Sequence, residues 1–242
     1  MGTFRIKFDS SGAASSGSGS DGHITAEQQD CLYWLGRYSE RVFTTTRVFM
    51  GTFDEMIDSR EDVYKDFCRR LEIPNIYTSS QDFVKRYCYD ETNPDSLISN
   101  LTRAFDNAIL LREVLGSDVL SYIQLAVYNF QKSASSSAPI LELQQVCDDI
   151  AAFWGMADDS IPIDRIRDLL KAGRRIERVD LYARLEFPES RMADAIRRLT
   201  SYRLVRSGIG CREERIRNLE ALQHTPGSYR QILFEIDHLF DA

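Results

Sequence analysis

The stretch "GRYSERV", Gly36–Val42, returns later in the chain as "GRRIERV", Gly173–Val179. Five of the seven positions are identical, and each copy sets a Glu-Arg pair inside an otherwise apolar run. Residues three, four or seven positions apart share one face of a helix, so the charges of each copy fall on one stripe. The glycine one turn before each glutamate leaves room for another helix to approach closely. The repeat predicts two related helices that arose by internal duplication.

The two stripes extend beyond the seven-residue copies and keep the same register. They are expected to hold Arg37, Glu40, Thr44 and Arg47 in the first copy, and Arg174, Glu177, Leu181 and Arg184 in the second. A third stretch of the same character places Arg112 and Glu113 between Leu111 and Val114. Three helices are therefore predicted to carry charge into apolar surroundings.

A glutamate that leaves water alone takes up a proton or destabilises the fold. Arginine is the suitable partner because its planar fork bonds a carboxylate at two points and keeps its charge when buried. Two interpretations stay open. In the structural one, Glu40, Arg41, Glu177, Arg178, Arg112 and Glu113 pair between helices and fix the register of a bundle.

In the functional interpretation the same charged groups line a cavity, where arginines bind a carboxylate or phosphate and a glutamate binds an amine or moves a proton. The candidate acid/base residues are Glu40, Glu177 and Glu113. The candidate anion-binding residues are Arg37, Arg41, Arg47, Arg112, Arg174, Arg178 and Arg184.

Composition narrows the classes of partner. The 242 residues carry a net charge of -7, which gives no electrostatic reason to expect nucleic acid or an anionic membrane as a partner. The five cysteines are scattered, with no C-x-x-C and no histidine at ligand spacing, so no metal is expected. No apolar run approaches the roughly 20 residues of a membrane helix, and the first residues lack a signal-peptide pattern. We expect a cytoplasmic protein.

From residue 24 to residue 242 the pattern is helical, and we expect one domain over this range. "TAEQ", beginning at Thr25, has the form of a capping box. Asn93, Pro94 and Gly116 have the residue types of an N-cap, a first helical position and a C-terminal stop. The predicted helices cover about 25–57, 59–74, 93–116, 117–132, 140–156, 160–187, 189–204, 213–223 and a last segment after 228. The fold class is an all-α bundle of six to nine helices.

Residues 1–23 differ from the rest. "FRIKF" alternates apolar and basic residues from Phe4 to Phe8, and a Ser/Gly-rich stretch follows. The segment is interpreted as a flexible tail or an expression leader, or as a short extended peptide that docks into a groove.

The sequence "LYWLGRYSERVFTTTRVF", Leu32–Phe49, resembles the signature of the alpha-E domain family, bacterial helical proteins named for a conserved Glu-Arg motif. Phe105–Ile123 resembles the middle motif of that family, and Ala172–Leu185 its second Glu-Arg helix. The positions that match these motifs are Arg37, Glu40, Arg41, Arg112, Glu113, Arg174, Glu177 and Arg178.

The resemblance implies a system containing a circularly permuted ATP-grasp ligase, often with a transglutaminase-like peptidase, that makes or modifies peptides through amide bonds. The chain shows no phosphate-binding loop and no Cys-His-Asp order, so we expect neither cofactor nor independent catalysis. We expect a partner component that binds the ligase and its peptide or acyl substrate. The alternatives are an enzyme that uses a glutamate as acid/base and arginine as anion stabiliser, and a purely structural interaction protein.

Overall fold

A computed structural model describes residues 24–58, 60–201 and 209–240. Within these ranges the chain forms eleven helices and no β-strand, apart from one isolated bridge between Cys211 and Phe240. In chain order the helices are α1 (Ala26–Asp58), α2 (Val63–Leu71), α3 (Ser80–Tyr89), α4 (Leu97–Leu110), α5 (Arg112–Leu115), α6 (Ser117–Ser133), α7 (Pro139–Ser160), α8 (Asp164–Arg184), α9 (Glu189–Leu199), α11 (Glu213–Leu222) and α12 (Tyr229–Asp237). The all-α prediction is confirmed, although the helices outnumber the predicted range.

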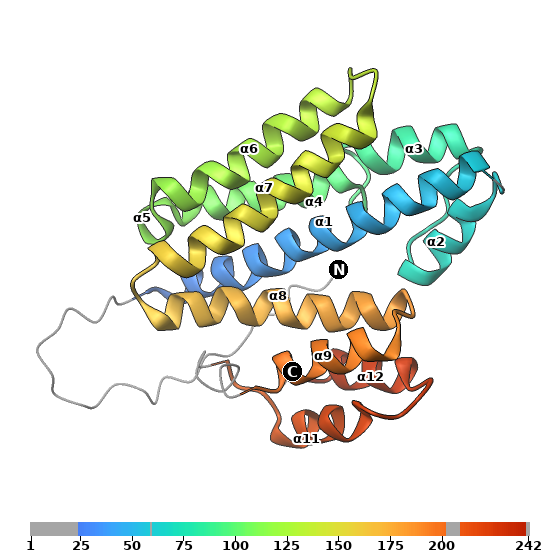
Figure 1. Cartoon of the computed structure of the whole chain (residues 1–242). Helices are drawn as coiled ribbons and strands as arrows, with labels where there is room; N and C mark the ends of the chain where they lie inside the picture. The colour runs from blue at the N-terminus through green and yellow to red at the C-terminus, as the bar shows by residue number, and fades with distance from the viewer. Residues whose placement is uncertain (1–23, 59, 202–208, 241–242) are drawn as a thin grey trace, which may run out of the picture.

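Helix α8 lies at the centre of the arrangement (Figure 1). It packs against α1 on one side and against α9 and α12 on the other, while α4, α6 and α7 complete the layer around α1. Helices α1 and α8 run side by side in the same direction. None of the helices in the described ranges has the length and apolar character needed to cross a membrane.

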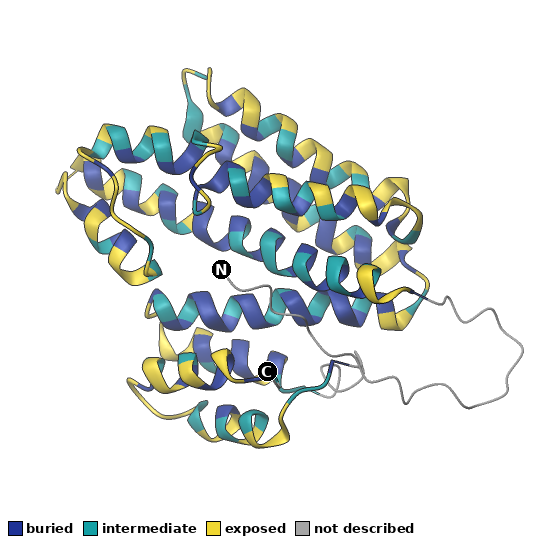
Figure 2. Cartoon of the chain, turned by 180° about the vertical axis from the view of Figure 1, so that it is seen from behind, coloured by how far each residue is buried: buried dark blue, intermediate teal, exposed yellow. Residues whose placement is uncertain are grey.

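Burial explains why α8 is unusual. Twelve of its 21 residues are buried, and they include Asp168, Glu177 and Asp180. Figure 2 shows the buried colour along much of this helix. A helix covered on two sides is normally apolar around most of its circumference, because buried charge is costly without a partner. The charged residues of α8 must therefore find their partners inside the protein.

Local sequence signals set several helix ends as predicted. Thr25 and Gln28 form the expected capping box: the Thr25 amide donates to the Gln28 side chain at 2.9 Å, and the Gln28 amide donates to Thr25 Oγ1 at 3.1 Å. Gly116 follows α5 with a φ of 80°, a conformation that costs glycine little.

The predicted start at Asn93 and Pro94 is wrong. Ser96 is the N-cap of α4, and its hydroxyl accepts the Ser99 amide at 3.1 Å. The Asn93 side chain instead accepts the Asp95 amide at 3.0 Å and donates to the Tyr77 hydroxyl at 3.1 Å. These two contacts turn the chain before the helix begins, so the start moves by three residues.

Helix α3 was not predicted, and the predicted helix 93–116 divides into α4 and α5 at Leu111. The cap of α3 is Ser79, which accepts the Asp82 amide at 3.1 Å. Its apolar face buries Phe83 and Tyr87 against Phe49 of α1. The predicted tail, residues 1–23, and the predicted helix end at 202–204 lie outside the described residues.

Candidate functional site

The repeated motif forms the contact between α1 and α8. A Cβ atom added to Gly36 would lie 2.1 Å from the Leu170 carbonyl oxygen, and one added to Gly173 would lie 2.0 Å from that of Tyr33. The two helices therefore meet backbone to backbone, as the glycines predict. Exchanging α1 with α8 turns the contact of Gly36 into the contact of Gly173. The two helices are therefore related by an approximate two-fold axis where they cross.

The glutamate of the second copy binds the arginines of the first. Glu177, on α8, is fully buried. Arg37 Nε donates to its Oε2 at 2.6 Å, and Arg41 Nε donates to its Oε1 at 2.5 Å, both from α1. Arg37 also donates to the Tyr33 hydroxyl at 3.2 Å.

The glutamate of the first copy binds the arginines of the second. Glu40, on α1, is also fully buried. Arg178 donates two hydrogen bonds to it, with Nε–Oε1 and Nη2–Oε2 distances of 2.7 Å. Arg174 Nε adds a contact of 3.2 Å to Oε2, and the Thr44 hydroxyl donates to Oε1 at 2.8 Å. The Glu-Arg pairs are thus reciprocal between α1 and α8, which we call the Glu-Arg cluster.

Mutual compensation keeps these groups charged. Burial raises the pKa of Glu177, but Arg41 and Arg37 more than offset it and hold that pKa below its ordinary value. Burial also lowers the pKa of Arg174, to about 10, which still leaves that guanidinium charged at neutral pH. Its Cζ atom lies 4.2 Å from the centre of the Trp154 ring, a favourable cation–π contact.

The two halves of the cluster differ in the number of hydrogen bonds that their glutamates accept and in the cavity beside them. The closed half consists of Glu40, Thr44, Arg174, Arg178 and the covering Trp154. Its glutamate accepts four hydrogen bonds from these side chains.

The open half consists of Glu177, Arg37 and Arg41, and its glutamate accepts two hydrogen bonds, both from these arginines. Both arginines line a cavity of about 260 Å³, and a third of the Arg41 side chain is exposed. The backbone of the crossing is approximately symmetric, but this cavity is lined by the arginines of the open half and not by those of the closed half.

Arg184 lines the same cavity from the end of α8. Its Nε and Nη2 donate to the buried Asp180 at 3.0 and 3.2 Å, and it also pairs with Glu72. Burial, with the nearby Glu177, raises the pKa of Asp180. Sequence reasoning missed Asp180, although its position four residues before Arg184 is the spacing of a helical ion pair.

Three predicted site residues lie elsewhere. Arg47 is exposed and stacks on Phe43, with its guanidinium 5.4 Å from the ring centre. Arg112 and Glu113 are exposed on α5. Their prediction as members of the cluster is wrong, because the break at Leu111 turns the short α5 so that these two side chains face solvent.

The cysteine thiols and the possible metal ligands among the described residues form no second candidate site. The cysteines are free thiols, and burial raises the pKa of Cys147 and of Cys211 to about 12, so both stay protonated at neutral pH. Within the described ranges, no group of three or more His, Cys, Asp and Glu residues is placed to hold a metal ion.

One family model matches this chain, over residues 26–205, and describes Alpha-E, a predicted alpha-helical domain with a conserved ER motif. The matched region contains both helices of the Glu-Arg cluster, α1 and α8. No curated protein and no solved structure matches the chain. The matched region covers most of the sequence, and the chain belongs to the Alpha-E family.

Proposed function

We propose that this chain is a helical partner component of a bacterial, cytoplasmic ATP-grasp system that forms amide bonds. In this proposal it binds the ligase and its peptide or acyl substrate through the open half of the Glu-Arg cluster. The resemblance of the motifs in α1 and α8 to those of the family supports the ligase and a transglutaminase-like peptidase as partners. The observation that carries the substrate-binding role is the cavity lined by Arg37 and Arg41, the arginines of the open half.

Arg41 is the group that supports anion binding. It contacts Glu177 through Nε alone, and no described residue accepts a hydrogen bond from its two terminal nitrogens. A guanidinium with free terminal N–H groups suits a carboxylate, which it can bind at two points. Its place in the cavity gives an incoming carboxylate access to it.

The cavity also offers negative charge. Asp95 and Asp237 are among its lining residues, and neither carboxylate forms an ion pair with a described residue. Arg41 and these aspartates line the same cavity and suit a ligand that carries both a carboxylate and an ammonium group. A free amino acid or a short peptide, with an ammonium at one end and a carboxylate at the other, has this combination, which supports a peptide substrate.

The enzymatic alternative receives less support. Glu40 and Glu177 are fully buried, and each is held by two guanidinium groups. A general acid or base must reach the substrate within hydrogen-bond distance and exchange a proton near neutral pH. A lowered pKa makes Glu177 a poor proton carrier at that pH. The cluster is better suited to binding and to structure than to proton transfer.

The test is reconstitution with a circularly permuted ATP-grasp ligase from the same organism. We expect the two proteins to co-elute in size-exclusion chromatography, and Arg41→Gln to weaken the complex or the ligase rate in the presence of substrate. Arg47→Gln is the matched control, since Arg47 lies on the same helix but outside the cluster. Failure of the wild-type chain either to bind the ligase or to change its rate would contradict the proposal.

A further inference from the structure

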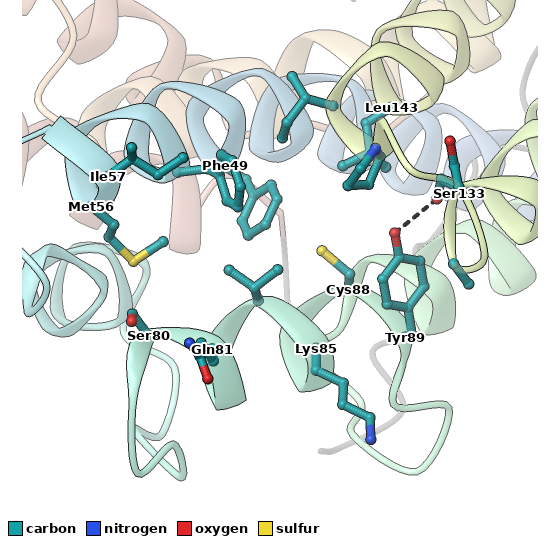
Figure 3. Close-up of a pocket in the computed structure, with 16 residues that line it drawn as sticks. Phe49, Met56, Ile57, Ser80, Gln81, Lys85, Cys88, Tyr89, Ser133 and Leu143 are labelled. Atoms are coloured by element: carbon teal, nitrogen blue, oxygen red, sulfur yellow. Dashed lines mark hydrogen bonds between the residues drawn. The ribbon is translucent and has the colours of Figure 1, made fainter.

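A second cavity, of about 650 Å³, contains none of the residues of the Glu-Arg cluster in its lining (Figure 3). The C-terminal half of α1 and the helix α3 form two of its walls, and the connection between α6 and α7 closes a third. Its lining is mostly apolar and includes Phe49, Phe53, Met56, Val84, Ile140 and Leu143. The cavity starts about 12 Å along α1 from Arg41, since a helix rises 1.5 Å per residue.

The cavity has the character of a small-molecule site. Its volume falls in the range of about 300–1,000 Å³ that is typical of ligand pockets, and apolar walls with few polar groups are also typical. The wall of α1 continues to Ile57, which is 68% exposed, so apolar surface reaches the solvent at the edge. Removing such surface from water favours an apolar ligand.

Two neutral polar groups in the lining, the hydroxyls of Tyr89 and Ser133, already have hydrogen-bond partners. Ser133 donates its hydroxyl proton to the Phe130 carbonyl at 2.6 Å, so its oxygen accepts from the Tyr89 hydroxyl at 2.9 Å. The Cys88 side chain points into the space between α1 and α3 in Figure 3, and burial raises the pKa of its thiol, which stays neutral. These groups therefore add little polar recognition.

Lys85 is the exception. It is the charged side chain in the lining, and no Asp or Glu joins it there. It is exposed and forms no ion pair with any residue in the described part of the chain. Figure 3 shows its side chain running away from Phe49 and Leu143, so that the ammonium does not lie among the apolar groups.

We propose that this cavity binds an acyl chain that ends in a carboxylate, with the chain among Phe49, Val84 and Leu143 and the carboxylate at Lys85. An apolar interior beside one unpaired cation matches a molecule with one apolar end and one negative end. An apolar helix of another protein would not require the lone cation, and a positively charged amphiphile would be repelled by it.

Isothermal titration calorimetry of the purified chain with dodecanoate, dodecylamine and dodecanol below their micellar concentrations tests this. We expect one dodecanoate per chain, bound about two- to fivefold more tightly than dodecylamine, as for an exposed ion pair. Lys85→Gln should remove this preference and retain chain binding. Lys65→Gln, which changes an exposed lysine of α2 outside the cavity, should keep both.

Val84→Trp should obstruct the cavity and weaken dodecanoate binding, while a far-UV circular dichroism spectrum like that of the wild type would show that it folds. Absence of dodecanoate binding to the wild type, equal affinity for dodecanoate and dodecylamine, or full binding by Val84→Trp would each overturn the proposal. The ligase is absent from these titrations, so their outcome is independent of the partner role proposed above.

Discussion

Glu177 shows how a carboxylate can stay charged inside a helical core. Its carboxylate is out of contact with water, and it stays ionised because Arg37 and Arg41 supply two charge-assisted hydrogen bonds. Glu40 accepts hydrogen bonds from the arginines of the opposite helix in the same reciprocal arrangement. The sequence predicted that such glutamates need arginine partners, and the structure pairs each glutamate with the other copy's arginines.

The lowered pKa of Glu177 predicts an acid-sensitive fold. A carboxyl whose folded-state pKa lies below its unfolded value of about 4.3 contributes stability that is present above that value and is lost as pH falls through the folded pKa. We expect the free energy of unfolding, from urea titrations, to decrease steadily from about pH 4.5 toward pH 2. A free energy that stays constant over this window, or protonation of Glu177 above pH 4.3 in carboxyl NMR spectra, would argue against the arrangement.

At the scale of elements, the decisive feature is the approach of α1 and α8 at their glycines. The contacts of Gly36 and Gly173 with carbonyl oxygens leave no room for a side chain. This closeness brings each arginine pair within reach of the facing glutamate. The glycine and the Glu-Arg pair of each copy therefore act together, because the ion pairs can form only when the helices lie close to each other.

Gly173→Ala should destabilise the protein by at least about 2 kcal/mol, because its Cβ would overlap the Tyr33 carbonyl and force the helices apart. The matched control is Gly155→Ala on α7, where a Cβ meets nothing within 4 Å. That change should stabilise the helix by about 0.5–1 kcal/mol. Urea unfolding at neutral pH measures the free energy of unfolding of both variants. Similar changes in this free energy for the two variants would be incompatible with the close crossing.

Local signals predicted elements well where one residue type had one role. The capping box at Thr25 is confirmed in both of its hydrogen bonds. Before α4, however, Asn93, Asp95 and Ser96 are all good cap residues, and the contact of Asn93 with Tyr77 favours the cap at Ser96. Such a choice depends on tertiary contacts that no local pattern contains.

Site prediction failed for a related reason. Arg112 and Glu113 stand in an apolar run like that of the repeat, and the pattern alone does not reveal the break at Leu111 that exposes them. Helix α3 had a usable signal, Ser79 followed by Asp82, a cap of the S-x-x-D type. The inequality of the open and closed halves could not be predicted, because Trp154 comes from a third helix.

At the scale of the whole molecule, α8 joins two layers. It packs against α1 of the larger bundle and against α9 and α12 on its other side (Figure 1). By sequence α8 is among the more polar helices, yet burial on two faces makes it part of the core. The Glu-Arg cluster therefore lies at the junction on which the arrangement of the layers depends.

Native-state hydrogen exchange should reveal this central position. Backbone amides around Ile176 and Val179 of α8 are expected to exchange only through global unfolding, with a free energy equal to that from urea titrations. Helix α11, in which only Leu219 is buried, should exchange through smaller local openings. Equal protection of α8 and α11 would contradict the central role of α8.

The most direct test of the account is the stability of Glu40→Gln and Glu177→Gln, measured by urea unfolding beside Glu113→Gln. Each of the first two leaves two half-buried arginines without their carboxylate and should cost about 3–5 kcal/mol. The exposed Glu113→Gln should change stability by less than about 0.5 kcal/mol. If Glu177→Gln keeps wild-type stability but loses activity in the reconstituted ligase system, the Glu-Arg cluster is catalytic and the structural account is wrong.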